Sequence, residues 1–423
     1  MDHDELVRRE EAVERVLSLR GAFLDDRPTE PVPIDRIAGR TLTDTVVADV
    51  TLPPHSHATM DGFAFDATAD GPRRIVADVY PEDDPSTVGS DGIAGIRPDE
   101  AVRIATGAPL PDGANAVIKR EDATVEDEVL ADPGIDSGTY VYERGTNVTA
   151  GETLFRAGER LTAKDAILLR DVGVEEVAVF ERLSVGVLAT GTEIHEGQSA
   201  DLDSPMLAGL VRSWGHDATY EGTVPDEYDR VEARIDDLAT EYDVVFTTGG
   251  TSVGRKDYVV RALAALGDVR FHGVRIRPGK PIAVATLPDH DAVAFAIPGK
   301  PVGAYTIATA VVRPFFTGDG TLPGIDARVS RDVGIGREGF EYWVPVTLDR
   351  DAIATPTGRA IDDLPDALPL GHVDSPLPTY EGTFDPSVLS SSTRATRADG
   401  FFVTESGVTA GETVRVVPYG PLE

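Results

Sequence analysis

Four glycine-rich loops in the second half of the chain carry residue types that could hold an anion. They are ATGTE at 189–193, TTGGTSVGRKD at 247–257, RPGKP at 277–281 and IPGKPVGA at 297–304. Glycine lets the backbone approach a bound group, while hydroxyls and lysine side chains add hydrogen-bond donors. Each loop alone could be an ordinary turn, and none matches a P-loop or a GxGxxG fingerprint. Together they predict a cradle for a phosphate or another oxyanion.

The positions of the lysines support this prediction. The chain has 39 Lys and Arg against 73 Asp and Glu, which gives a net charge of −34. Five residues are lysine, and three of them, Lys256, Lys280 and Lys300, lie in these loops. A local excess of cations in so acidic a chain indicates an anion site. The overall balance argues against a nucleic-acid partner, because binding a duplex needs a basic face.

The composition predicts a salt-adapted cytoplasmic protein of several domains. A length of 423 residues exceeds one ordinary domain, and 41% hydrophobic residues can form real cores. An acidic surface with almost no lysine suggests a halophilic protein. The absence of cysteine excludes disulfides and thiolate metal sites. No apolar run of about 18 residues predicts a membrane span, and the acidic N-terminus does not resemble a signal peptide.

The loops need strands and helices to position them. From about residue 182, strand-like runs such as 182–190 and 243–250 alternate with helical patterns at 204–215 and 227–240. This alternation with short links predicts a parallel, doubly wound α/β domain. Ligands bind beyond the carboxyl ends of the strands in such sheets, and we expect all four loops there.

The rest of the chain reads as β-rich segments with helical pieces. Short β-like runs between Gly and Pro turns predict an inserted β-rich domain at 54–140 and a C-terminal β-domain at 323–423. Helical patterns occupy 4–20 and 162–173.

The N-terminal half holds weaker candidates. Asp61 in HATMDGFAFD reads by itself as a turn residue, and Thr106 in ATGAPLPDGANAVIKRED lies in a rigid, proline-containing turn. His55 and His57 could suggest a metal pair, but no partner motif accompanies them, so a solvated loop is the better interpretation.

Together the motifs resemble the MoeA-type molybdopterin molybdenumtransferase family, which includes the gephyrin E domain. The matching stretches are MDGFAFD, ATGAPLPDGANAVI, ATGTEI, TTGGTSVGRKDY, RIRPGKP and IPGKPVGA, in that order, followed by SSSTRATRADGFFV and GETVRVVP. The resemblance covers nearly the whole chain.

This resemblance implies a multidomain fold of the α/β plus β class and a homodimer. The implied domains are a discontinuous, elongated N-terminal domain (1–53 and 141–181), an inserted β-rich lid (54–140), a MogA-like α/β domain (182–322) and a C-terminal β-barrel (323–423). The implied site lies between the α/β domain of one subunit and the N-terminal half of the other.

The implied reaction consumes adenylylated molybdopterin and molybdate or tungstate, uses Mg²⁺ and releases AMP. The resemblance also implies other cofactor-synthesis proteins as partners. The matching motifs assign catalytic roles to Asp61, Thr106, Glu193, Asp257 and Lys280. They assign substrate binding to Thr190, Gly191, Gly249, Gly250, Thr251, Ser252, Gly254, Lys256, Arg277, Pro298, Gly299, Lys300 and Pro301. Because Mg²⁺ prefers oxygen ligands, its candidate ligands are Asp61, Glu193, Asp203 and Asp257.

The chain departs from the family pattern at five positions. Thr146, Asn147 and Thr192 replace acids, and Pro205 and Lys300 replace amides. These changes predict a more positive pocket. They fit either altered metal and oxyanion handling or binding without turnover. The alternatives to an insertase are therefore a non-catalytic carrier of the pterin intermediate and an adenylyltransferase.

Overall fold

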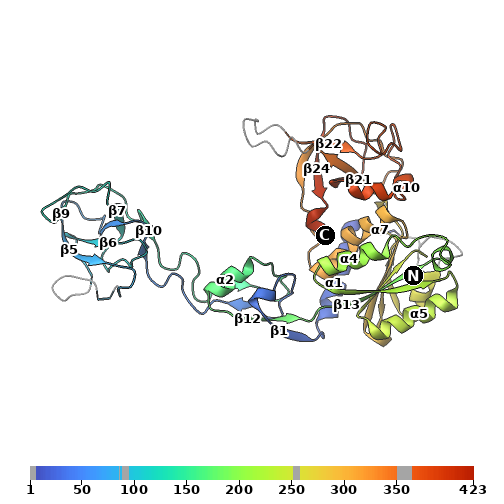
Figure 1. Ribbon diagram of the computed structural model, residues 1–423, viewed down its shortest axis with the longest axis horizontal. Helices are drawn as coiled ribbons and strands as arrows, with labels where there is room; N and C mark the ends of the chain where they lie inside the picture. The colour runs from blue at the N-terminus through green and yellow to red at the C-terminus, as the bar shows by residue number, and fades with distance from the viewer. Residues whose placement is uncertain (1–5, 85, 88–94, 251–257, 350–363) are drawn as a thin grey trace. The chain divides into compact units, whose positions relative to one another are not determined.

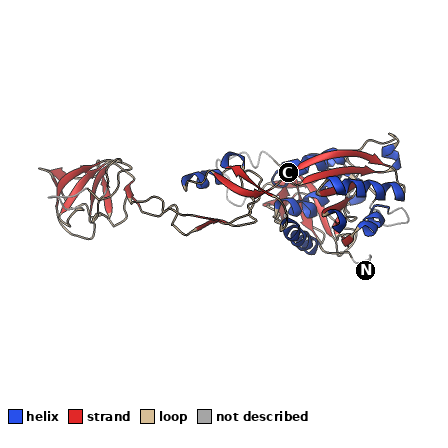
Figure 2. Ribbon diagram, turned by 90° about the horizontal axis from the view of Figure 1, so that it is seen from below, coloured by secondary structure: helices blue, strands red, loops and turns tan. Residues whose placement is uncertain are grey.

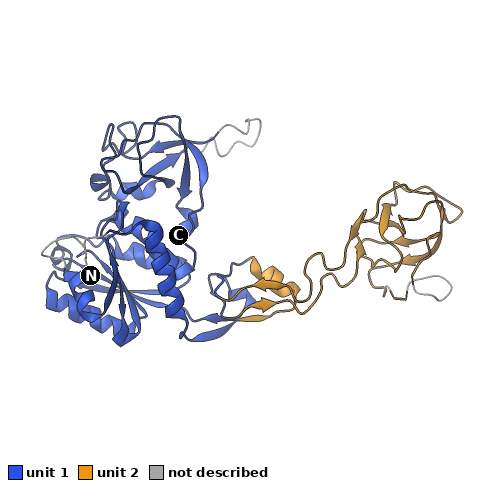
Figure 3. Cartoon of the chain, turned by 180° about the vertical axis from the view of Figure 1, so that it is seen from behind, with its two compact units in different colours: residues 1–43, 158–163, 178–423 blue, residues 44–157, 164–177 orange. Residues whose placement is uncertain are grey.

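The structure is a computed structural model that describes residues 6–84, 86–87, 95–250, 258–349 and 364–423. Contacts divide the chain into two compact units (Figure 3). The first unit contains residues 1–43, 158–163 and 178–423, and the second contains 44–157 and 164–177. The domain boundaries predicted from the sequence remain a prediction.

A six-stranded sheet forms the centre of the first unit, in the order β14-β13-β15-β19-β18-β16. Its strands are β13 (Ser184–Thr190), β14 (Asp217–Val224), β15 (Val244–Thr248), β16 (Asp268–His272), β18 (Ala283–Leu287) and β19 (Ala292–Ile297). The helices that follow these strands are α3 (Thr192–His195), α4 (Ser204–Ser213), α5 (Tyr228–Glu241), α6 (Tyr258–Leu266) and α7 (Pro301–Ile307).

Helices cover both faces of this sheet, so it is doubly wound. In β19, Val293, Phe295 and Ile297 join the core on one face, which includes residues of α4. The intervening alanines join the core on the other face, which includes residues of α5 and α6. Successive residues of a strand point to opposite faces, so one fully apolar strand serves both cores. Figure 1 shows α4 and α5 on opposite sides of the sheet. The predicted doubly wound α/β domain is confirmed.

The prediction of an all-parallel sheet is wrong. Strands β14, β13, β15 and β19 are parallel, but β18 pairs antiparallel with β19, and β16 pairs antiparallel with β18. No helix separates β16 from β18, so a reversal of direction replaces the crossover that a parallel pair needs.

Helical segments at both ends of the α/β domain cover one face of the sheet. α1 (Arg9–Leu24) packs against α8 (Arg313–Thr317) and the preceding π-helical turn η3 (Ala308–Val312). The helix predicted at 4–20 is observed as α1, which begins at Arg9 and ends at Leu24. β1 (Thr29–Pro33), which pairs with β12 (Glu176–Phe180), and the short helix η1 (Ile34–Arg36) follow α1.

The C-terminal part of the first unit is a small barrel, as predicted. Its strands are β20 (Ile325–Val329), β21 (Glu341–Leu348), β22 (Asp366–Pro369), β23 (Gly400–Thr404) and β24 (Thr413–Pro418). The order β21-β22-β20-β24-β23 closes because β23 also pairs with β21. β17 (Ile276–Arg277) adds to β21, and α10 (Pro386–Leu389) lies between β22 and β23 in the chain.

The second unit is mostly strands and loops, as Figure 2 shows. Its larger sheet has the order β7-β4-β6-β5-β9-β8. The strands are β4 (Gly62–Phe65), β5 (Arg73–Val79), β6 (Glu100–Ile104), β7 (Ala116–Lys119), β8 (Val125–Glu126) and β9 (Val129–Leu130). Two separate strand pairs also belong to the second unit: β3 (His57–Ala58) pairs with β10 (Val141–Tyr142), and β2 (Val46–Val47) pairs with β11 (Thr153–Phe155). The unit also contains the helix α2 (Asp165–Asp171).

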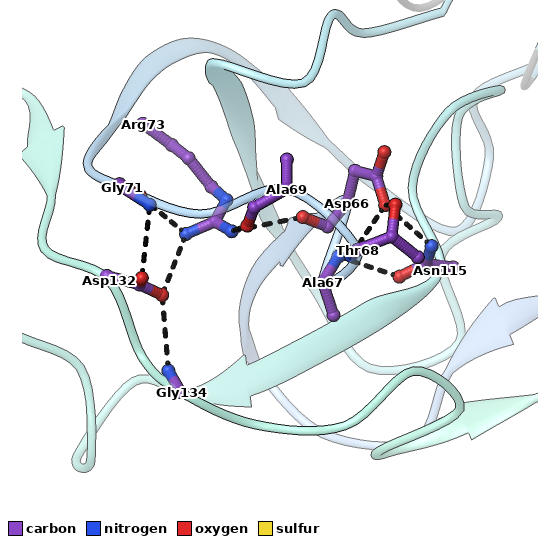
Figure 4. A network of polar contacts seen from close by, with 9 residues as sticks. All are labelled: Asp66, Ala67, Thr68, Ala69, Gly71, Arg73, Asn115, Asp132 and Gly134. Carbon is purple, nitrogen blue, oxygen red and sulfur yellow. Dashed lines mark hydrogen bonds and ion pairs between the residues drawn. The ribbon is translucent and has the colours of Figure 1, made fainter.

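A buried arginine organises one end of this larger sheet (Figure 4). The Arg73 side chain is 1% exposed and lies over the Phe65 ring, 4.5 Å from its centroid. It donates to the carbonyl oxygens of Gly71 and Asp66 and pairs with Asp132 at 3.3 Å. These partners compensate the cost of burying the charge.

None of the described helices is both long and apolar enough to cross a membrane.

Candidate functional site

Three of the four glycine-rich loops follow parallel strands of the sheet and meet at its carboxyl edge. The buried Thr190 hydroxyl, at the end of β13, donates to the Thr248 carbonyl oxygen at the end of β15 (2.9 Å). A Cβ on Gly249 would lie 2.7 Å from the Thr190 carbonyl oxygen, and one on Gly299 would lie 2.9 Å from the Gly249 Cα. Side chains at these positions would push the loops apart, so the glycines allow the loops to pack backbone to backbone.

The fourth loop, RPGKP, reaches the same edge by another route. It follows β17, which belongs to the barrel sheet, so the expectation that it ends a strand of the α/β sheet is wrong. The loop leads into β18, which is antiparallel to β19. The first residues of β18 therefore lie at the same edge of the sheet as the last residues of β19, and the loop reaches that edge. Gly279 (φ +116°) packs against α7, since a Cβ there would lie 2.6 Å from Ile307.

These loops surround a cavity of about 430 Å³. Three cations, Arg277, Lys280 and Lys300, line it, and no carboxylate belongs to its described wall. The other lining residues are Gly249, Gly250, Pro278, Gly279, Pro281, Pro298, Gly299, Gly303, Pro386, Ser387 and Ser390. In a chain with net charge −34, a wall of this kind favours an anionic ligand.

The guanidinium of Arg277 is held by the barrel. It lies over the Phe340 ring, 4.6 Å from the centroid, and its buried Nε has no hydrogen-bond partner among the described residues. The pKa of Asp385 is lowered mainly by hydrogen bonds from Ser387, with a smaller contribution from Arg277.

Lys300 immediately precedes α7 and is exposed. Its Nζ contacts the carbonyl oxygen of Ser387 at 3.4 Å, a long hydrogen bond. Within the described ranges no ion pair includes Lys300, so the carboxylate partner that would make it an ordinary surface charge is not found there. Pro301 begins α7, where its missing N–H costs nothing.

Sequence reasoning missed the barrel's contribution to this cavity. Pro386 and Ser387 of α10 and the following Ser390 complete the wall, and the Ser390 carbonyl oxygen accepts from the Val302 N–H (3.1 Å). The serine-rich run at 390–392 was a visible signal, but its place beside α7 depends on contacts between segments far apart in the sequence.

Among the predicted metal ligands that the structure describes, Asp203 is buried, whereas Asp61 and Glu193 are exposed. It occupies the N-cap position of α4, is 5% exposed and makes no side-chain capping bond. Its Oδ1, the Oδ2 of Asp201 and the Oγ of Ser204 are buried without a hydrogen-bond partner in the described structure. Burial, and then the charge of Asp201, raise the pKa of Asp203 to about 6. Oxygen atoms left in this way suit a proton or a cation.

Glu193 lies on α3, directly after the first loop. Its side chain is exposed, and its carboxylate lies close to Gly191, where a Cβ would be 3.0 Å from Oε1. Thr192 does not line the cavity; its hydroxyl accepts from the Asp226 N–H at 3.1 Å.

In the second unit the structure brings Asp61 and Thr106 together. One carboxylate oxygen of Asp61 accepts from both the N–H and the hydroxyl of Thr106, each at 2.7 Å. These bonds lower the pKa of Asp61. A cavity of about 500 Å³ beside Asp61 is also lined by Tyr80, Arg103 and Arg120. The structure therefore places an oriented carboxylate in the wall of this cavity.

The remaining candidates fall in several places. Thr251, Ser252, Gly254, Lys256 and Asp257 lie outside the described residues. Asn147 accepts from the Tyr142 hydroxyl, and the His57 ring packs on that of Tyr142. Where the structure is described, no group of three His, Asp or Glu side chains is placed to hold a metal ion.

Two family models match the chain. Residues 7–173 match the MoeA N-terminal region (domain I and II), and residues 186–318 match a probable molybdopterin binding domain. The molybdopterin molybdenumtransferase of Synechococcus elongatus is 31% identical over 304 residues, which are 67% of this chain and 74% of that protein. A putative molybdopterin biosynthesis protein of Methanocaldococcus jannaschii is 29% identical over 317 residues, 70% of this chain and 76% of that protein.

Solved structures extend the similarity to the whole chain. A molybdopterin biosynthesis MoeA protein structure from Pyrococcus horikoshii aligns with a TM-score of 0.64 and 26% identity, covering 98% of this chain and 99% of that chain. A second structure of a molybdopterin biosynthesis MoeA protein from Pyrococcus horikoshii has a TM-score of 0.70 at 21% identity and covers 98% of this chain and 100% of that chain. At this identity the similarity supports the fold alone.

Proposed function

Because the chain belongs to the molybdopterin molybdenumtransferase family of molybdenum cofactor biosynthesis, we propose that it inserts molybdenum from molybdate, or tungsten from tungstate, into adenylylated molybdopterin and releases AMP. The observation that carries this proposal is the cavity with Arg277, Lys280 and Lys300 in its wall and no carboxylate among its described lining residues. Both reactants are anions, so they are matched by this wall.

The cavity residues would bind and orient the oxyanion. Arg277 offers a planar guanidinium already fixed against Phe340, while Lys280 and Lys300 act as compact charges. The glycines of the neighbouring loops let backbone N–H groups approach the ligand. A fixed set of donors stabilises an oxyanion without reorganisation during the reaction.

Asp61 and Thr106 would act at the adenylyl end of the substrate. The two hydrogen bonds from Thr106 keep Asp61 ionised and hold its carboxylate in one orientation. We propose that the working enzyme is a homodimer whose site combines these two residues with the cationic cavity, as the family resemblance implies.

The oxygen-rich surroundings of Asp203 fit Mg²⁺. The unpartnered oxygens of Asp203, Asp201 and Ser204 are the donor type this cation prefers, and Asp61, Glu193 and Asp257 remain candidate ligands. Mg²⁺ bound there would neutralise phosphate charge. Asp203 itself would hold either the cation or a proton, because its carboxylate has no other partner in the described structure.

One incubation separates this function from its alternatives. The protein is mixed with adenylylated molybdopterin, Mg²⁺ and molybdate, and released AMP is measured by chromatography. The insertase releases AMP only when the oxyanion is present, a carrier binds the substrate without releasing AMP, and an adenylyltransferase consumes ATP instead. Lys280→Ala should lose AMP release, whereas Lys164→Ala, which removes an exposed lysine of the second unit, should retain it.

A further inference from the structure

The segment at 6–9, which leads into α1, binds the base of the RPGKP loop. The Val7 N–H donates to the Gly273 carbonyl oxygen at 3.2 Å, and the Arg275 N–H donates to the Val7 carbonyl oxygen at 2.9 Å. Val7 and Val274 accordingly form a parallel bridge. The segment therefore pairs with the backbone that leads into the loop, as an added strand would, and both lie in the first unit.

The same backbone stretch closes the loop on itself. The Gly273 N–H donates to the Ile282 carbonyl oxygen at 2.7 Å, and the Val274 N–H donates to the Lys280 carbonyl oxygen at 3.0 Å. These bonds bring the two ends of the loop together. Arg277 and Lys280 supply two of the three cations in the cavity wall, so the position of this base determines where both charges lie.

An ion pair closes a ring of contacts around Arg275. The Glu341 N–H donates to the Arg275 carbonyl oxygen at 2.8 Å, and the Glu341 carboxylate accepts from the Arg9 Nε at 2.9 Å. Both side chains of the ion pair are mostly buried, with 17% of Arg9 and 9% of Glu341 exposed. Burial raises the pKa of Glu341, and the charge of Arg9 opposes this shift. Val7 on one side of Arg275 and Glu341 on the other are therefore joined through Arg9.

Leu6 holds the segment at its other end. Its carbonyl oxygen accepts from the Nε of Arg275 at 3.1 Å. Its side chain packs on the barrel core and fills the space beside Gly273, where a Cβ would lie 2.5 Å from the Leu6 Cδ2. Because Gly273 also has a φ of +85°, glycine is required there on two counts.

The ion pair also bears on the support of the Arg277 guanidinium. This group lies over the Phe340 ring, 4.6 Å from its centroid, and Phe340 directly precedes Glu341 in the chain. Glu341 begins β21, which pairs with β17. Through Glu341, Arg9 therefore acts on both the strand that carries Arg277 and the ring beneath its guanidinium.

We propose that the segment at 6–9 positions Arg277 and Lys280 toward a bound oxyanion, with Arg9 as the positioning residue. None of these four residues belongs to the described wall of the cavity, so the segment acts through the two cations. Donors that are fixed before the ion arrives bind it without reorganisation. This inference rests on the proposed function, because it takes the cavity as the oxyanion site.

Molybdate binding by the full chain tests the proposal. Arg9→Met should weaken the Kd for molybdate about tenfold in calorimetric titrations at matched KCl, because donors that lose their fixed geometry bind the ion less well. Arg9→Lys keeps the charge and should recover most of the affinity. Arg8→Met removes the neighbouring exposed arginine and should bind molybdate as wild type does.

A double variant separates positioning from stability. Arg9→Met alone leaves the buried Glu341 carboxylate unpaired, which can unfold the barrel. Combining Arg9→Met with Glu341→Gln removes both charges and keeps an oxygen that can accept from the Trp343 Nε1. This double variant should fold and still bind molybdate about tenfold more weakly than wild type.

Hydrogen exchange followed by mass spectrometry gives a readout that needs no ligand. In the double variant the amides of residues 274–277 should exchange about tenfold faster than in wild type, whereas those of β13 should keep their wild-type rates. If wild type and the double variant bind molybdate equally, the proposal is overturned and the proposed function stands. If wild type binds no molybdate, the proposed function fails, and exchange decides the positioning role. Unchanged exchange at 274–277 would then overturn it, and faster exchange would support it.

Discussion

Replacing Asp203 by asparagine should stabilise the metal-free protein at neutral pH. The aspartate is 5% exposed, its Oδ1 has no described hydrogen-bond partner, and its pKa is raised to about 6 from an ordinary value of 3.8. One pKa unit corresponds to about 1.4 kcal/mol, so ionised Asp203 costs the folded state about 2 to 3 kcal/mol. Asparagine keeps the size of the side chain and removes the charge.

The sign of the pH dependence follows from proton counting. Between about pH 4 and pH 6 the folded state holds a proton on Asp203 that the unfolded state has lost, so wild-type stability falls as pH rises through this window. Asp203→Asn removes this term. The two proteins should have similar stability near pH 4, and the variant should be more stable above about pH 6.

Urea unfolding with EDTA at a series of pH values measures this difference. Both tryptophans, Trp214 and Trp343, are buried in the first unit with Asp203, so their fluorescence reports on the correct unit. Asp289→Asn, at an exposed position, is the matched control. Parallel pH profiles for wild type and Asp203→Asn would refute the reasoning. Adding Mg²⁺ should stabilise wild type more than the variant if Asp203 is a metal ligand.

Four further predictions concern binding, turnover, assembly and salt. Lys300→Asn should weaken molybdate binding about tenfold, near 1.4 kcal/mol, in calorimetric titrations at matched KCl, and an unchanged Kd would exclude Lys300 from the site. Asp61→Asn should reduce AMP release roughly a hundredfold with an unchanged circular dichroism spectrum, and wild-type turnover would remove Asp61 from the mechanism. Light scattering should give a dimer of the 45.0 kDa chain, and a monomer at working concentration would contradict this. The melting temperature should rise with KCl because salt screens a net charge of −34, and a flat profile would argue against salt adaptation.

The sequence was most informative where one segment determines its own structure. The β13, β15 and β19 runs are apolar on both faces, and such continuous apolar runs identify buried strands of a covered sheet. The loops after them were recognisable from glycine and lysine spacing. The direction of β18 was not, because strand direction depends on pairing rather than on local pattern.

Sequence reasoning was least informative where distant segments meet. Ser387 and Ser390 reach the cavity only because the barrel packs on α7, and Asp203 occupies an N-cap position without capping α4. The side chain of an aspartate at a helix N-cap normally accepts a hydrogen bond from a backbone N–H. The buried, unpartnered Oδ1 of Asp203 could therefore be recognised only in the three-dimensional structure.

The departures from the family pattern differ in physical weight. Within one chain Lys300 lines the cationic cavity, whereas Thr192 contacts the backbone of Asp226, and Thr146 and Asn147 belong to the second unit. In strong salt the Debye length is about 3 Å at 1 M, so the loss of a remote acid is almost fully screened. A lysine in direct contact with a ligand keeps its effect because no solvent separates the charges. Of the predicted changes toward a more positive pocket, the gain of Lys300 should therefore alter anion affinity most, and the lost acids should matter only where their positions contact the substrate.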